Sequence, residues 1–176
     1  MCGGRRPMIT YTSLPIAGAE KQSERETMPK TAVLYASGFT KNTQRIAEYI
    51  SSKTGAETFD LKKNIPADLN QYDTIIFGTG VHAGKPYAPV QKFISDNREI
   101  LKNKKVKLFI TCMYNDEKGK NQCARISGMW GIPDAVFFNK KEDRMNADGI
   151  PVSVDEFIKG LRCRFFRLLS LPRRIS

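Results

Sequence analysis

The sequence has a single histidine, His82, and four cysteines that are spread along its 176 residues without any Cys-x-x-Cys pair. Zinc sites are built from clustered cysteines and histidines, so this composition argues against a metal site. No apolar run approaches the ~20 residues that a membrane-spanning helix needs. Scattered cysteines fit packing roles in a reducing compartment, so we predict a cytoplasmic protein, and no side chain is assigned a catalytic role.

Acidic residues are missing from the last part of the chain. The net charge is +11, of which residues 1–28 carry +1, residues 29–158 carry +4, and residues 159–176 carry +6 with no acid at all. The bases of this last stretch lie among phenylalanines and leucines. Such a basic apolar end fits peripheral contact with an anionic membrane, at the inner membrane face, or an acidic redox partner. No nucleic acid is expected, because no recognition motif accompanies the charge.

The chain divides into three parts. Residues 1–28 are predicted to form a flexible N-terminal extension, since they combine Gly3-Gly4, Pro7, Pro15 and a polar run. They imitate a secretory signal only weakly, because hydroxyl residues and a proline interrupt the apolar middle. Residues 29–161 are predicted to form one domain, and residues 162–176 a basic apolar tail that continues the last helix.

Strand and helix patterns alternate within this domain. Apolar runs predict strands at 31–36, 74–78, 105–112 and 134–138, and the alternating run 56–61 predicts an outer, half-exposed strand. Apolar residues at helical spacing predict helices at about 42–53, through 90–101, at about 119–129, and from about 154 until Pro172. The alternation predicts an α/β fold with a five-stranded parallel sheet and right-handed crossovers. Ligands of such sheets bind beyond the carboxyl ends of the strands.

The first of these ends carries the most informative loop of the chain. It reads Ser37, Gly38, Phe39, Thr40, Lys41, Asn42 and Thr43, and a helix follows at once. Backbone N–H groups at a helix start are unpaired and the helix dipole is positive there, so the loop suits a phosphate. Its hydroxyls and amide can add donors, and its glycine lets the backbone turn closely around a ligand. The alternative is an ordinary helix N-cap, which Ser, Thr and Asn commonly form.

Two more loops should leave the same edge of the sheet. The second begins with Thr79, Gly80, Val81, His82, Ala83 and Gly84, and the third with Met113, Tyr114 and Asn115. The second loop matches a dinucleotide fingerprint with alanine in the third glycine slot. It follows the third strand, however, and no acid stands where ribose binding needs one, so NAD is not favoured. The three loops are expected to converge on one crevice.

On these residues the chain resembles the flavodoxin-like FMN proteins across residues 31–161. The run 35–43 is similar to the family's phosphate loop, and the run 78–84 is similar to the loop that flanks the flavin ring. The resemblance implies a three-layer sandwich with strand order 2-1-3-4-5 and FMN held by the residues of the three loops. The first loop is one residue longer than the usual form, so Thr40 and Thr43 compete for the central phosphate contact.

The resemblance also implies where the flavin ring would lie. Tyr114 is expected to form one aromatic wall, with a surface tyrosine as the alternative, and His82 or Tyr87 the other. The glycines at 80 and 84 would allow the backbone to approach the ring. Cys112 lies at a strand end nearby, where a buried small side chain is favoured over a redox thiol.

The function implied is an FMN-binding electron-transfer protein that exchanges electrons with a redox partner protein or a quinone. An alternative is a quinone-linked protoporphyrinogen IX dehydrogenase at the membrane surface. The flavodoxin-like protoporphyrinogen oxidase is a basic relative and is similar in the first two loops, but this chain lacks its long basic insertion. A third possibility is a non-redox module that has lost FMN.

Overall fold

The computed structural model describes residues 30–114, 116–139 and 144–169, without the side chains of residues 162–169. The predicted extension at 1–28 and the end of the predicted tail therefore lie outside the described residues. In chain order the elements are β1 (Thr31–Ala36), α1 (Asn42–Thr54), β2 (Glu57–Asp60), β3 (Thr74–His82), β4 (Lys85–Pro86), α2 (Ala88–Asp96), α3 (Arg98–Leu101), β5 (Lys105–Cys112), α4 (Glu117–Trp130), β6 (Ala135–Asn139) and α5 (Val152–Leu169). Among the described helices, none is long and apolar enough to cross a membrane.

The sheet has the order β2-β1-β3-β5-β6, and all neighbours on this path run parallel. The short strand β4 lies off the path and pairs antiparallel with β3. Counted over the five parallel strands, this is the predicted order 2-1-3-4-5, which the structure confirms. The register places Ala36 beside Thr79, and Gly80 beside Thr111, so the carboxyl ends of β1, β3 and β5 are level with one another.

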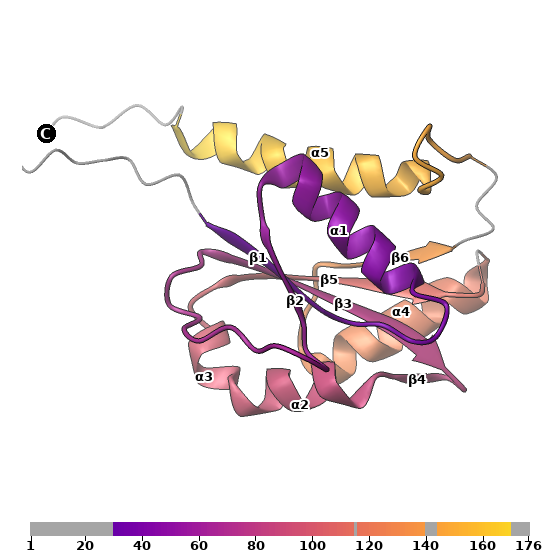
Figure 1. The fold of residues 1–176 in the computed structure, drawn as a ribbon, viewed down its shortest axis with the longest axis horizontal. Coiled ribbons are helices and arrows are strands. Elements are labelled where there is room, and N and C mark those ends of the chain that lie inside the picture. The colour runs from indigo at the N-terminus through magenta and orange to yellow at the C-terminus, as the bar shows by residue number, and fades with distance from the viewer. Residues whose placement is uncertain (1–29, 115, 140–143, 170–176) are drawn as a thin grey trace, which may run out of the picture.

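Helices cover both faces of this sheet, which gives three layers (Figure 1). Alternate strand residues point to opposite faces, so each strand contributes to two cores. One core joins Leu34, Phe77 and Ile110 to α2, α3 and α4. The other joins Val33 and Phe109, among others, to α1 and α5. The layers place the start of α1 directly beyond the end of β1.

Two elements differ from the sequence-based expectation. β3 continues through Thr79 to His82, where a loop was predicted, because Ala83 and Gly84 both have positive φ (47° and 75°) and close a two-residue hairpin with β4. Such turns match the twist of paired strands. The helix predicted through 90–101 is split at Asn97, whose side-chain amide donates to the Phe93 carbonyl (2.9 Å) and so ends α2.

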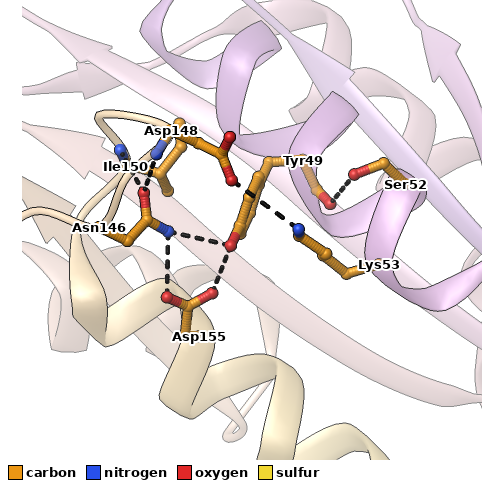
Figure 2. Close-up of polar contacts among 7 residues, drawn as sticks. All are labelled: Tyr49, Ser52, Lys53, Asn146, Asp148, Ile150 and Asp155. Carbon is orange, nitrogen blue, oxygen red and sulfur yellow. Dashed lines mark hydrogen bonds and ion pairs between the residues drawn. The ribbon is translucent and has the colours of Figure 1, made fainter.

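A polar cluster ties the turn before α5 to α1 (Figure 2). The Asn146 side chain accepts from the backbone N–H groups of Asp148 and Ile150 (both 3.0 Å). Its amide donates to the Tyr49 hydroxyl (2.9 Å) and to Asp155 (3.0 Å), and Tyr49 donates to Asp155 (2.6 Å). One asparagine therefore both shapes the turn and joins it to two helices.

Candidate flavin site at the carboxyl edge of the sheet

Side-chain hydroxyls join the carboxyl ends of β3 and β5 to the start of α1. The hydroxyls of Thr43, at the start of α1, and Thr111, on β5, are 2.7 Å apart. Thr111 also donates to the Thr79 carbonyl on β3 (3.5 Å). Gly80 lies beside this pair, and a Cβ atom there would stand 3.2 Å from the Thr43 hydroxyl. Of the predicted convergence of three loops, the structure thus shows contacts among the first two loops and the end of β5; among the described residues, no hydrogen bond joins the third loop to the other two.

Helix α1 begins without a side-chain cap. Its N-cap residue is Lys41, which has φ 53° and makes no side-chain capping bond, so the predicted alternative of a Ser, Thr or Asn cap is not what the structure shows. The Gln44 N–H donates to Ser37 Oγ (3.4 Å) and the Arg45 N–H to the Lys41 carbonyl (2.9 Å). Within the described chain, the N–H groups of Phe39, Thr40, Asn42 and Thr43 have no protein acceptor.

These free donors lie at the positive end of the helix dipole, a position that favours phosphate groups. The two threonines that competed for the central contact differ in their surroundings. Thr43 is 2% exposed and its hydroxyl is turned towards Thr111. Thr40 is exposed on the loop. Of the two hydroxyls, only that of Thr40 lies open to solvent at the mouth of the loop.

The second loop is a rigid hairpin. Arg125 of α4 donates to the Gly84 carbonyl and fixes the tip of the turn. At its base, the buried Thr79 hydroxyl accepts from the Tyr87 N–H and donates to the Gly80 carbonyl (both 3.0 Å). His82 is exposed at the end of β3, opposite Lys85 in the hairpin. The hairpin therefore offers a preformed wall beside the ends of β1 and β5.

The third loop presents apolar side chains to solvent. Met113 is 79% and Tyr114 47% exposed, and Phe39 of the first loop is fully exposed. The Tyr114 carbonyl accepts from the Cys112 thiol (3.0 Å) and lies where a Cβ atom on Gly119 would be only 2.7 Å away. Exposed flat and flexible apolar side chains on the first and third loops suit an aromatic ligand. Asn115, also predicted for the site, lies outside the described residues.

The cysteines near this edge are buried. Burial raises the pKa of the Cys112 thiol and raises that of Cys123, on α4, to about 11. Reactive cysteines need a lowered pKa and access to solvent. Both thiols are therefore protonated at neutral pH, as the predicted packing role requires.

One residue at this edge was not anticipated from the sequence. Lys62 follows β2, and its ammonium donates to the Ser37 carbonyl in the first loop (2.5 Å). The same ammonium lies 4.7 Å from the centre of the Tyr87 ring. The signal was available, because β2 is parallel to β1 and its carboxyl end must lie at the same edge. A lysine two residues beyond that end is within reach of the loop.

Comparison with known proteins places this geometry in a family. The flavodoxin domain family matches residues 32–147, which include all three loops. The chain belongs to the flavodoxin domain family. A curated relative, an uncharacterized protein of Methanocaldococcus jannaschii, is 34% identical over 82 residues, which are 47% of this chain. The chain spans about half, 53%, of that relative's length.

Solved structures of flavodoxins have the same fold. The WrbA-like flavodoxin of Agrobacterium tumefaciens superposes with a TM-score of 0.54 and 19% identity, over 77% of this chain and 99% of that one. Flavodoxin 2 of Bacillus cereus gives 0.55 and 17%, over 77% and 99%. A flavodoxin of Fusobacterium nucleatum gives 0.55 and 16%, over 78% and 99%. The sheet order and the helix layers described above are therefore those of flavodoxins.

Proposed function

We propose that this flavodoxin domain binds FMN at the carboxyl edge of its sheet and carries electrons between redox partners. The observation that supports it most is the uncapped start of α1, where backbone donors face solvent between strand ends that the threonine hydroxyls hold together. The Fusobacterium nucleatum flavodoxin of similar fold was solved bound to flavin mononucleotide. A flavin nucleotide has a phosphate for the free N–H groups of the first loop and an aromatic ring for the exposed apolar side chains.

The residues present fit the two ends of this cofactor. The free N–H groups of Phe39, Thr40, Asn42 and Thr43 and the exposed Thr40 hydroxyl would bind the phosphate, with the Lys41 side chain adding a positive charge. Gly80 carries no side chain, and the space beside it at the end of β3 is taken by the Tyr87 ring. Tyr114, Met113 and the hairpin would flank the ring. In this proposal the loops take the roles expected from the sequence, except that the buried Thr43, whose hydroxyl is bonded to Thr111, supports the loop and leaves the phosphate contact to Thr40.

Bound FMN would supply the redox chemistry, since its ring accepts and releases electrons. The protein's own part is to hold and orient the cofactor and to shape its surroundings. The hairpin is fixed by Arg125 and Thr79, so it would position the ring without a large rearrangement. No side chain needs to gain or lose a proton for this role.

An absorbance and fluorescence titration of the purified protein with FMN tests the proposal. We expect a saturable shift of the flavin absorbance band with quenched fluorescence at micromolar FMN. Thr40→Ala should weaken binding about tenfold, because one hydrogen bond to a charged phosphate is lost. Ser52→Ala, a hydroxyl at the far end of the same helix, is the matched control. Absence of binding at micromolar FMN would refute the proposal and leave the flavin-free module.

The quinone-linked dehydrogenase stays a prediction that a second assay separates from the electron carrier. FMN-loaded protein is mixed with protoporphyrinogen IX and a quinone, and porphyrin formation is followed by fluorescence. Turnover faster than that of free FMN would show that the protein is the dehydrogenase and would refute the electron-carrier proposal. A rate equal to that of free FMN would favour the carrier.

A further inference from the structure

Tyr87 lies across two glycines at the mouth of the phosphate loop. A Cβ atom on Gly38 would stand 1.9 Å from the Tyr87 hydroxyl oxygen, and one on Gly80 would stand 2.6 Å from its ring. The backbone of Tyr87 is held by its N–H bond to Thr79 (3.0 Å). Its phenol is thus aimed at the first loop, although Tyr87 belongs to the segment after the second.

The Tyr87 hydroxyl has no hydrogen-bond partner among the described residues. The Tyr87 side chain is half-buried and its hydroxyl is not among the enclosed polar atoms of the described residues, so it stays available to donate to a ligand. The unpaired N–H groups of Phe39 and Thr40 stand in the same loop, beside Gly38. Donors from two separate segments therefore converge on one place, and all of them lack an acceptor.

Lys62 adds a positive charge to the same place. The turn that carries it is fixed to β1, because the Leu61 N–H donates to the Tyr35 carbonyl (2.8 Å) and the Lys62 N–H to Asp60 (3.1 Å). The ammonium has three protons, and the Ser37 carbonyl takes one of them. The other two remain for a ligand in the loop, and the Tyr87 ring stabilises the cation at 4.7 Å.

We propose that the Tyr87 hydroxyl and the Lys62 ammonium bind the phosphate of the flavin nucleotide. They complete the loop at 37–43 from two other segments and make the site select FMN over riboflavin. The inference rests on the proposed function, because it takes FMN as the ligand. It assigns to Tyr87 a phosphate contact in place of the ring wall considered from the sequence, and it gives Lys62 a role in binding.

The test compares the dissociation constants of FMN and riboflavin, measured by flavin fluorescence, for the unmodified chain and four variants, of which Tyr87→Ala removes the whole ring. Tyr87→Phe removes only the hydroxyl, and Lys62→Met removes only the charge. Lys63→Met is the matched control, because Lys63 is the next residue and its side chain is 75% exposed, 4.0 Å from Asp60. A hydrogen bond to a charged group corresponds to roughly 10- to 100-fold in affinity.

We expect Tyr87→Phe and Lys62→Met each to weaken FMN binding at least about tenfold and to leave riboflavin binding unchanged. Lys63→Met should bind both like the unmodified chain. If Tyr87→Phe and Lys62→Met lost the same affinity for FMN as for riboflavin, or lost no affinity for FMN, the inference would be overturned. The proposed function is judged separately, by whether the unmodified chain binds FMN. Tighter FMN binding by Tyr87→Ala would also overturn it, since the ring would then merely obstruct the site. If Tyr87→Phe fails to fold, the exposed Lys62 variant decides the question.

Discussion

Replacing Tyr49 by phenylalanine measures what one hydroxyl contributes to the contact between α1 and α5. The hydroxyl donates to the Asp155 carboxylate at 2.6 Å and accepts from the Asn146 amide at 2.9 Å (Figure 2). The ring and its packing stay in place. A neutral hydrogen bond contributes about 1 kcal/mol net and one to a charged group about 1.5–3 kcal/mol. Because the cluster is only half-buried, we expect the free energy of unfolding at pH 7 to fall by about 1–3 kcal/mol.

The stability difference between the native protein and Tyr49→Phe should depend on pH through the pKa of Asp155. The Tyr49 hydrogen bond is the main cause that lowers the pKa of Asp155 below 3.8. A carboxyl whose pKa is lower in the folded state adds stability above its unfolded pKa, and that stability is lost as the pH falls through the folded pKa. The variant lacks this bond, so its Asp155 pKa should move back towards 3.8. The stability difference between the two proteins should therefore shrink below about pH 4.

At alkaline pH the titrating group is Tyr49 itself, whose pKa is raised and not lowered. The bond to Asp155 raises the pKa of Tyr49 to about 12 from 10.0. A group whose pKa is raised on folding adds stability below its unfolded pKa, and that stability is lost as the pH rises through the folded value. The native protein should lose the contribution of this hydroxyl between pH 10 and about 12. The phenylalanine variant has no hydroxyl there to titrate.

Urea unfolding at pH 7 and pH 3, followed by the fluorescence of Trp130, measures both effects. Tyr114→Phe is the control, because it removes an exposed hydroxyl that lies outside the cluster. A loss in Tyr49→Phe of the same size at both pH values would refute the electrostatic argument. A loss below about 0.5 kcal/mol at pH 7 would show that water replaces the hydroxyl without cost.

Two further predictions concern the core beside the site. Gly78→Ala should destabilise the fold by about 1–3 kcal/mol in urea unfolding, because the new Cβ would stand 2.3 Å from the buried Phe109 ring. In a chain that also carries Phe109→Leu, Gly78→Ala should destabilise the fold less. An unchanged stability of Gly78→Ala would contradict this packing. In a variant in which Cys2 and Cys163 are replaced by serine, Cys112 and Cys123 should react with a thiol reagent at pH 8 only after unfolding, because burial raises the pKa of both thiols. Prompt reaction of the folded variant would contradict this prediction.

Most of the sheet could be predicted because its central strands are buried on both faces and therefore read as unbroken apolar runs, whereas the half-exposed β2 has an alternating pattern. The run from Thr74 to Phe77 and the run from Lys105 to Cys112 fall where β3 and β5 lie. The end of α1 could also be predicted, because Gly55 follows it with a φ of 71°, a backbone conformation that favours glycine. Once strands alternate with helices, the handedness of crossovers leaves few arrangements, and the flavodoxin order is one of them.

The hairpin after β3 could not be predicted in the same way. Tight hairpins of this type favour Asn-Gly or Gly-Gly, and here Ala83 takes the first position with a φ of 47°. An alanine in this conformation costs about 1–2 kcal/mol, so no local preference of the sequence indicates the turn. The contacts of Arg125 and Thr79 with the hairpin hold it, and they come from residues distant in the sequence or from its base.

The glycines of the first two loops show where sequence reasoning stops at the site itself. Gly38 and Gly80 were expected to make room for a ligand, and in the structure the room at both is taken by Tyr87. A missing Cβ atom permits a close approach without specifying which group approaches. Tyr87 is 49 residues from Gly38, and only the pairing of β1 with β3 brings the two together. The loop and its free backbone donors can therefore be expected from local sequence, whereas the side chains that reach it from other segments follow from the register of the sheet. The comparison of FMN with riboflavin distinguishes a Tyr87 that binds the phosphate from a Tyr87 that occupies the space of the phosphate.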